Sequence, residues 1–156
     1  MKYAGINYND FAAAPGVSVT FFTQGCPHRC KNCHNPETWD FNGGKEFDEN
    51  ILLKIENALF ANGIQRNLCI MGGEPMCESN LPLTHLLVNY FKNKYPTLNI
   101  YIWTGYLIEN LNNPLAKEIL SKADYLIDGP YIDDLKDTTL FMRGSKNQRI
   151  IDLQNK

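Results

Sequence analysis

Short apolar runs alternate along this chain with segments whose apolar residues follow a helical period. The runs are rich in β-branched and aromatic residues, which favour strands, and each is followed closely by a glycine. We therefore predict strands at residues 17–22, 68–71, 100–103 and 125–127.

Three other segments repeat apolar residues every three or four positions, as one face of a helix does. The first begins at Asp48, a residue type that caps helices, and is expected to end at Gly63. The second has the most regular stripe, and the third opens at Asn113 and Pro114. The three stripes are Leu52, Ile55 and Leu59; Leu83, Leu86, Leu87, Tyr90 and Phe91; and Leu115, Ile119 and Leu120.

Strands separated by helices imply right-handed crossovers and a parallel sheet. A complete eight-unit barrel takes about 250 residues, and this chain has 156. The predicted fold class is therefore α/β: a partial, incomplete βα barrel with a mainly parallel sheet, built as a single domain over residues 1–156. The open side of such a barrel suits a bulky substrate, such as a segment of another protein.

The composition narrows the class of protein. Charged residues make up 21% of the chain, its formal net charge is -2, and its estimated pI is 5.9, so it lacks the basic footprint of a nucleic-acid-binding protein. No apolar run approaches the roughly 18 residues of a membrane span, and the N-terminus lacks the pattern of a secretory signal. We expect a cytoplasmic protein that binds neither nucleic acid nor membrane.

Three of the five cysteines, Cys26, Cys30 and Cys33, lie in the loop after the first predicted strand. Thiolates are soft ligands that select iron-sulfur clusters, zinc or cuprous copper. Three thiols leave one coordination position open, whereas a closed structural site takes four protein ligands. A zinc site completed by His28 or His34 remains an alternative. Disulfides are less favoured, because the chain has an odd number of cysteines and no secretory signal pattern.

Other turn-forming motifs follow the predicted strands: residues 72–75 read Gly-Gly-Glu-Pro, 104–105 Thr-Gly, and 128–130 Asp-Gly-Pro. In parallel sheets, ligands bind at the carboxyl ends of the strands. We expect these turns to meet the cysteine loop at one edge of the sheet. Cys69 lies inside a predicted strand, so we expect it to be a small buried core residue.

The spacing C-x3-C-x2-C, followed by Gly-Gly-Glu-Pro, resembles the radical S-adenosylmethionine superfamily. Three further stretches resemble one subfamily, the anaerobic ribonucleoside-triphosphate reductase activating proteins. They are Asn-Pro-Glu-Thr-Trp at 35–39, Asp-Gly-Pro-Tyr at 128–131, and Arg-Gly-Ser-x-Asn-Gln-Arg-Ile at 143–150. The resemblance covers residues from about 15 to 151.

The resemblance implies a fold of the radical S-adenosylmethionine type and two cofactors. A 4Fe-4S cluster would be bound by Cys26, Cys30 and Cys33, and its fourth iron would bind S-adenosylmethionine. Cys77 follows the glycine-rich turn but is not expected to ligate, because a fourth thiolate would close the open position. No catalytic side chain is expected beyond the cluster and cofactor. The residues expected to contact S-adenosylmethionine are Asn32, Cys33, His34, Gly72, Gly73 and Glu74. Asn32 departs from the pattern, since many members have an aromatic residue just before the third cysteine.

The implied function is reductive cleavage of S-adenosylmethionine to generate a glycyl radical on the large subunit of the anaerobic ribonucleoside-triphosphate reductase, with an electron donor such as flavodoxin. The segment 143–150 is expected to take part in partner or cofactor binding. Three alternatives remain: an activase of another glycyl-radical enzyme, such as a formate-lyase type; a radical enzyme acting on a small molecule; and a zinc-binding interaction module.

Overall fold

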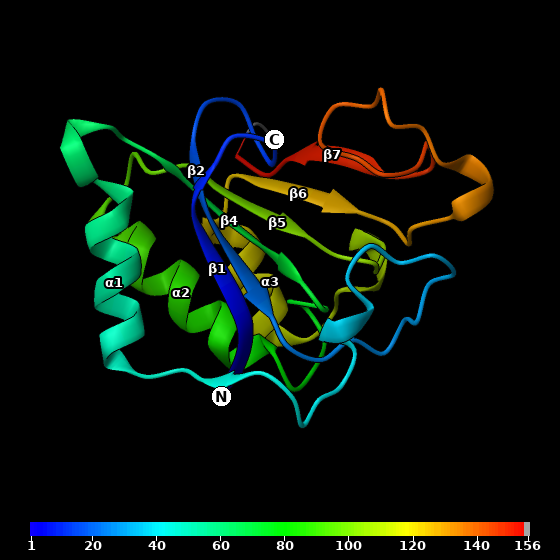
Figure 1. Ribbon diagram of the computed structural model, residues 1–156, viewed down its shortest axis with the longest axis horizontal. Helices are drawn as coiled ribbons and strands as arrows, with labels where there is room; N and C mark the ends of the chain where they lie inside the picture. Colours follow the sequence, from blue (N-terminus) through cyan, green and yellow to red (C-terminus); the bar gives the residue numbers. More distant parts are fainter. Residues whose placement is uncertain (155–156) are drawn as a thin grey trace.

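The computed structural model describes residues 1–154 and contains one seven-stranded sheet with helices on one face (Figure 1). The strands are β1 (Lys2–Asp10), β2 (Ser18–Thr23), β3 (Lys45–Glu46), β4 (Asn67–Gly72), β5 (Ile100–Trp103), β6 (Tyr125–Asp128) and β7 (Arg149–Asp152). The α-helices are α1 (Glu49–Leu59), α2 (Leu81–Lys94) and α3 (Pro114–Lys122). Short 3-10 turns lie at Pro36–Thr38, Ala61–Gly63, Ile108–Asn110 and Asp133–Leu135.

The strand order is β3-β1-β2-β4-β5-β6-β7. The central strands β2, β4, β5 and β6 pair in parallel, whereas β1, β3 and β7 add antiparallel pairs on the two sides. The α/β class and the parallel centre are therefore confirmed. The predicted barrel is not confirmed, because the sheet is open: its outer strands are β3 and β7.

The four predicted strands and three predicted helices are confirmed. Asp48 caps α1 by accepting a hydrogen bond from the amide of Ile51 at 3.1 Å, and Asn113 caps α3 by accepting one from Leu115 at 2.8 Å. The first helix ends earlier than expected, at Leu59, and a separate 3-10 turn continues to Gly63. Strands β1, β3 and β7 were not predicted.

The core lies between the sheet and the helices. Alternate strand residues such as Phe21, Ile70 and Ile102 are fully buried against the stripes of the helices, which pack on that face alone. Within residues 1–154, the other face is not covered by a helix and carries a smaller apolar cluster around Tyr101 and Ile127. Because the central strands are parallel, the loops that follow them lie at one edge of the sheet, next to the cysteine loop. No helix formed by residues 1–154 has the length and apolar character of a membrane span.

Candidate functional site

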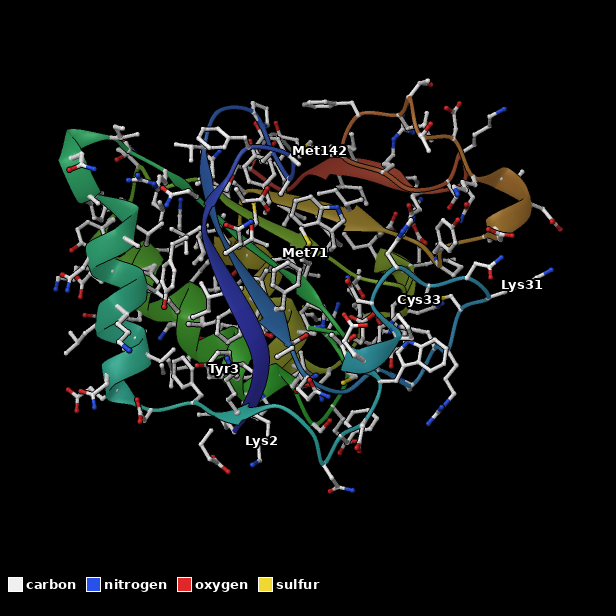
Figure 2. All side chains as sticks on the ribbon, in the orientation of Figure 1. Lys2, Tyr3, Lys31, Cys33, Met71 and Met142 are labelled. Carbon is white, nitrogen blue, oxygen red and sulfur yellow. The ribbon has the colours of Figure 1, made fainter. Side chains whose placement is uncertain are left out.

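A cavity of about 190 Å³ lies at the carboxyl-end edge of the sheet, where Figure 2 shows Cys33. Its lining brings together the loops that the sequence predicted to converge: the cysteine loop and the turns after β4, β5 and β6. The lining includes Cys26, Cys30, Cys33, Gly72, Gly73, Glu74, Thr104, Gly105 and Gly129. The sequence motifs and the cavity therefore coincide.

Two residues expected to contact the cofactor, Asn32 and His34, lie outside the lining of this cavity. Asn32 is exposed and donates a hydrogen bond to Asp133 at 2.9 Å, and His34 makes an edge contact with the ring of Tyr131. Neither lines the cavity. Asn32 has a φ of 57°, a left-handed conformation that asparagine adopts more readily than an aromatic residue does. The backbone of the loop therefore accounts for asparagine at this position.

The three cysteines differ in exposure. Cys26 is buried, and this burial raises the pKa of its thiol to about 11, whereas Cys30 and Cys33 are partly exposed. The backbone turns tightly between the latter two, where the amide of Cys33 donates to the carbonyl of Cys30 at 3.1 Å. All three thiols thus border one cavity from a single short loop.

The donor set fits an iron-sulfur cluster better than a single ion. Within residues 1–154, no three His, Cys, Asp or Glu side chains are grouped closely enough to hold one metal ion. A cluster spreads its thiolate ligands over several iron atoms, so its cysteines need only border a common cavity. His28 also lines the cavity, but its Nε2 lies 2.6 Å from Glu74 Oε1 and is engaged there.

Glu74 is the most heavily hydrogen-bonded side chain of the site. Its carboxylate is 1% exposed, and its Oε1 lies near His28 and accepts from the amide of Gly105 at 2.7 Å. Its Oε2 accepts from the amide of Met76 at 2.9 Å and the hydroxyl of Thr104 at 2.7 Å. A carboxylate has about four acceptor sites, so these protein groups fill them. Glu74 therefore joins three loops.

The two glycines of the Gly-Gly-Glu-Pro turn permit a close approach of two backbones. Gly72 has a φ of +108°, which side-chain-bearing residues rarely adopt. A Cβ on Gly73 would lie 2.4 Å from the carbonyl oxygen of Gly25, and the amide of Glu74 donates to that same oxygen at 2.8 Å. Gly25, which directly precedes Cys26, was not singled out from the sequence, although its position beside the cysteine was a signal.

The two remaining cysteines lie outside the cavity lining. Cys69 is fully buried in β4, as predicted, and burial raises the pKa of its thiol to about 12. Cys77 is also buried, with its Sγ 3.6 Å from the hydroxyl of Ser79. Neither is placed to replace one of the three loop thiols.

The segment 143–150 packs against the turn that follows β6. Gln148 lines the cavity; its Oε1 accepts from the amide of Gly144 at 2.8 Å and its Nε2 donates to the carbonyl of Gly129 at 3.1 Å. Arg149 donates from Nε to the buried carboxylate of Asp128 at 2.9 Å. These contacts give Gln148 a place in the cavity wall and Arg149 a structural role.

A family model described as a 4Fe-4S single cluster domain matches residues 12–151. The site therefore belongs to a protein of the iron-sulfur class. Similar curated proteins include those of Escherichia coli K12, 35% identical over 140 residues (89% of this chain, 90% of the relative), and Pasteurella multocida, 35% identical over 152 residues (96% of each). A phage T4 protein is 35% identical over 150 residues, or 96% of this chain and 93% of its own length.

All three relatives are named anaerobic ribonucleoside-triphosphate reductase-activating protein. At this identity over nearly the whole chain, the protein belongs to the family of anaerobic ribonucleoside-triphosphate reductase-activating proteins.

Proposed function

We propose that this protein, acting as one domain over residues 1–156, is a radical S-adenosylmethionine activase that generates a glycyl radical on the large subunit of the anaerobic ribonucleoside-triphosphate reductase. The observation that carries the proposal is that Cys26, Cys30 and Cys33 line the same cavity as the Gly72-Gly73 turn. The names of the relatives support the reductase as partner.

Cys26, Cys30 and Cys33 would hold a 4Fe-4S cluster through three thiolates, so that one iron remains free of protein ligands. When bound, these groups would supply the chemistry: one electron from the cluster would cleave the C5′–S bond of S-adenosylmethionine, release methionine, and let the deoxyadenosyl carbon take a hydrogen atom from a reductase glycine. The chain's own contribution is to bind and orient these groups and to exclude water from them.

The proposed contacts to S-adenosylmethionine lie at its methionine end, near the turn after β4, and at its adenine end, near the cysteine loop. Gly72 and Gly73 border the cavity with bare backbone, which suits close approach of the methionine end. Glu74 shapes that turn through its own hydrogen bonds. Cys33 also borders the cavity, whereas Asn32 and His34 would reach the adenine end only if the loop moved.

The decisive experiment is anaerobic. Reconstituted protein is mixed with S-adenosylmethionine, reduced flavodoxin as electron donor, and the reductase large subunit, and the sample is examined by electron paramagnetic resonance. A glycyl-radical signal on the reductase is the expected result. Without the reductase, we expect slow or unproductive cofactor cleavage, because the sheet is open and the partner has to complete the cavity. A signal that arises only on a formate-lyase-type enzyme would assign the protein to a different glycyl-radical partner.

We propose that the reductase approaches a second cavity. It measures about 280 Å³ and lies over the helix-free face of the sheet, between Met71 and Met142 (Figure 2). Met71 and Trp103 line both cavities, so the two adjoin. Arg143 lines the second cavity; its Nη1 donates to the carbonyl of Gln148 at 3.2 Å, and its buried Nε has no hydrogen-bond partner among the described residues. A guanidinium has five N–H donors, so Arg143 keeps donors beyond the one used by Gln148 for an acceptor group of the partner.

Arg143→Ala should reduce the yield of glycyl radical at least several-fold while leaving the iron content unchanged. The expected loss arises because the variant removes a cation from the second cavity and no residue from the first. Lys146→Ala, an exposed change on the same loop, is the matched control. Equal radical yields from Arg143→Ala and Lys146→Ala would remove Arg143 from the docking surface. Arg149 is a poorer probe, because its removal would leave the buried Asp128 without its cation.

A further inference from the structure

His28 reaches from the cysteine loop into a socket formed by two other loops. Its side chain is 17% exposed, and its Nε2 lies 2.6 Å from Glu74 Oε1 in the turn after β4. The imidazole ring also makes an edge contact with the ring of Tyr106, in the loop after β5, at a centroid distance of 4.5 Å. One side chain thus touches both neighbouring loops.

Gly105 supplies the space for this ring. A Cβ built on Gly105 would lie 2.6 Å from His28 Cδ2 and 2.7 Å from Nε2, closer than unbonded atoms can approach. The φ of Gly105 is not in the left-handed region, so its backbone conformation does not itself demand glycine. The nearest atoms that a side chain would meet are those of His28, and the two residues therefore fit each other specifically.

The cysteine loop itself has exposed, irregular backbone. Arg29 and Lys31 are exposed, and Arg29 has a φ of 50° that its residue type seldom adopts. The amide of Cys26 donates to Trp39 at 3.3 Å, a contact that holds only the beginning of the loop. His28, whose side chain is 17% exposed, provides a mostly buried anchor between Cys26 and Cys30.

We propose that His28 is a positioning residue that locks the cysteine loop onto the turns after β4 and β5, so that Cys26 and Cys30 border the cavity before any cluster is bound. This inference rests on the proposed function for its purpose, since it assumes that these thiols are the ligands. The lock itself is a property of the chain without cofactor, and it can be measured there.

The first test is limited trypsin digestion of the cluster-free protein. Arg29 and Lys31 are exposed trypsin sites inside the loop, so mass spectrometry of cleavage after them reports how often the loop opens. His28→Ala should raise this cleavage rate roughly tenfold, since a charge-assisted hydrogen bond and ring packing are lost. His28→Gln, which retains a donor for Glu74, should restore part of the protection.

The control is His85→Ala. His85 also pairs with a glutamate, its Nε2 lying 3.0 Å from Glu118 Oε1, but this pair is more exposed and joins α2 to α3, away from the site. It should leave the cleavage rate in the loop unchanged. Thermal denaturation of all variants separates loop opening from global unfolding.

A double-mutant cycle tests the socket. Gly105→Ala should displace the ring and expose the loop as His28→Ala does, whereas the His28→Ala/Gly105→Ala pair should be no worse than His28→Ala alone. Additive effects, or wild-type cleavage in a folded His28→Ala variant, would overturn the inference.

The second readout is retention of iron after anaerobic reconstitution. His28→Ala should lose iron to a chelator several-fold faster than wild type and His85→Ala; equal loss rates would overturn the positioning role. If the wild-type protein bound no cluster, the proposed function would fail, while the digestion and the cycle would still decide whether His28 locks the loop.

Discussion

Alanine in place of any one of Cys26, Cys30 and Cys33 should reduce the iron bound per chain from one 4Fe-4S cluster to almost none. The three thiols line one cavity, and the other two cysteines of the chain are buried outside its lining, so no thiol is placed to substitute for a lost ligand. The measurement is iron and sulfide analysis after anaerobic reconstitution, together with the visible absorption of the cluster.

Cys69→Ala and Cys77→Ala are the matched controls, because each removes a buried thiol and leaves the loop intact. Both should retain full iron content. Stoichiometric iron in a Cys30→Ala variant, or loss of iron in a folded Cys69→Ala variant, would show that other thiols are the ligands. Zinc instead of iron in the wild-type protein purified without oxygen would favour an interaction module.

Gly73→Val should abolish both cluster and S-adenosylmethionine binding and destabilise the fold by about 1–3 kcal/mol or more. The sequence predicts that Gly72 and Gly73 contact S-adenosylmethionine, and loss of that contact alone would leave the cluster bound in Gly73→Val. The structure changes the expectation, because a Cβ on Gly73 would lie 2.4 Å from the carbonyl oxygen of Gly25. The clash is with backbone next to Cys26, and it also breaks the hydrogen bond from the amide of Glu74 to Gly25.

Gly5→Val is the control for this substitution. Gly5 lies in β1, has nothing within 4 Å of an added Cβ, and has no left-handed φ. Chemical denaturation measures stability, and calorimetric titration with S-adenosylmethionine measures binding. A Gly73→Val protein that is as stable as Gly5→Val and still binds its cluster would show that the turn and the cysteine loop are not coupled through Gly25.

The parallel centre of the sheet could be predicted because its strands are short apolar runs buried on both sides. Leu68 and Ile70 face the helices, and Cys69 faces the opposite cluster. The outer strands could not be predicted in the same way. β1 contains Gly5, Asn7 and Asn9 among its apolar residues, and its pairing with β2 is broken by irregularities in register.

β7 contains two isoleucines between charged residues, and its pairing partner β6 fixes it in place. The two-residue β3 has too little sequence to carry a pattern. With β1, β3 and β7 paired antiparallel on its two sides, the sheet is open, and the partial barrel that the sequence suggested is not confirmed.

The convergence of the site residues could also be predicted, because loops that follow parallel strands meet at one edge. The hydrogen bond between His28 and Glu74 could not be predicted from the sequence. The two residues are 46 positions apart, and each residue type has several plausible roles at its position. Histidine beside cysteines suggests a metal ligand, and glutamate after two glycines suggests a cofactor contact. Only the structure shows that the two side chains pair with each other, with His28 Nε2 2.6 Å from Glu74 Oε1.

The shared carboxylate of Glu74 has a thermodynamic consequence. The Glu74 carboxylate accepts hydrogen bonds from its own turn and from the loop after β5, and it pairs with His28 in the cysteine loop. If any one of these three segments detached, the buried carboxylate would lose a hydrogen-bond donor. Their local unfolding is therefore cooperative, and ordering one segment lowers the entropic cost of ordering the rest. A molecule that binds one of these loops in its docked conformation therefore stabilises all three.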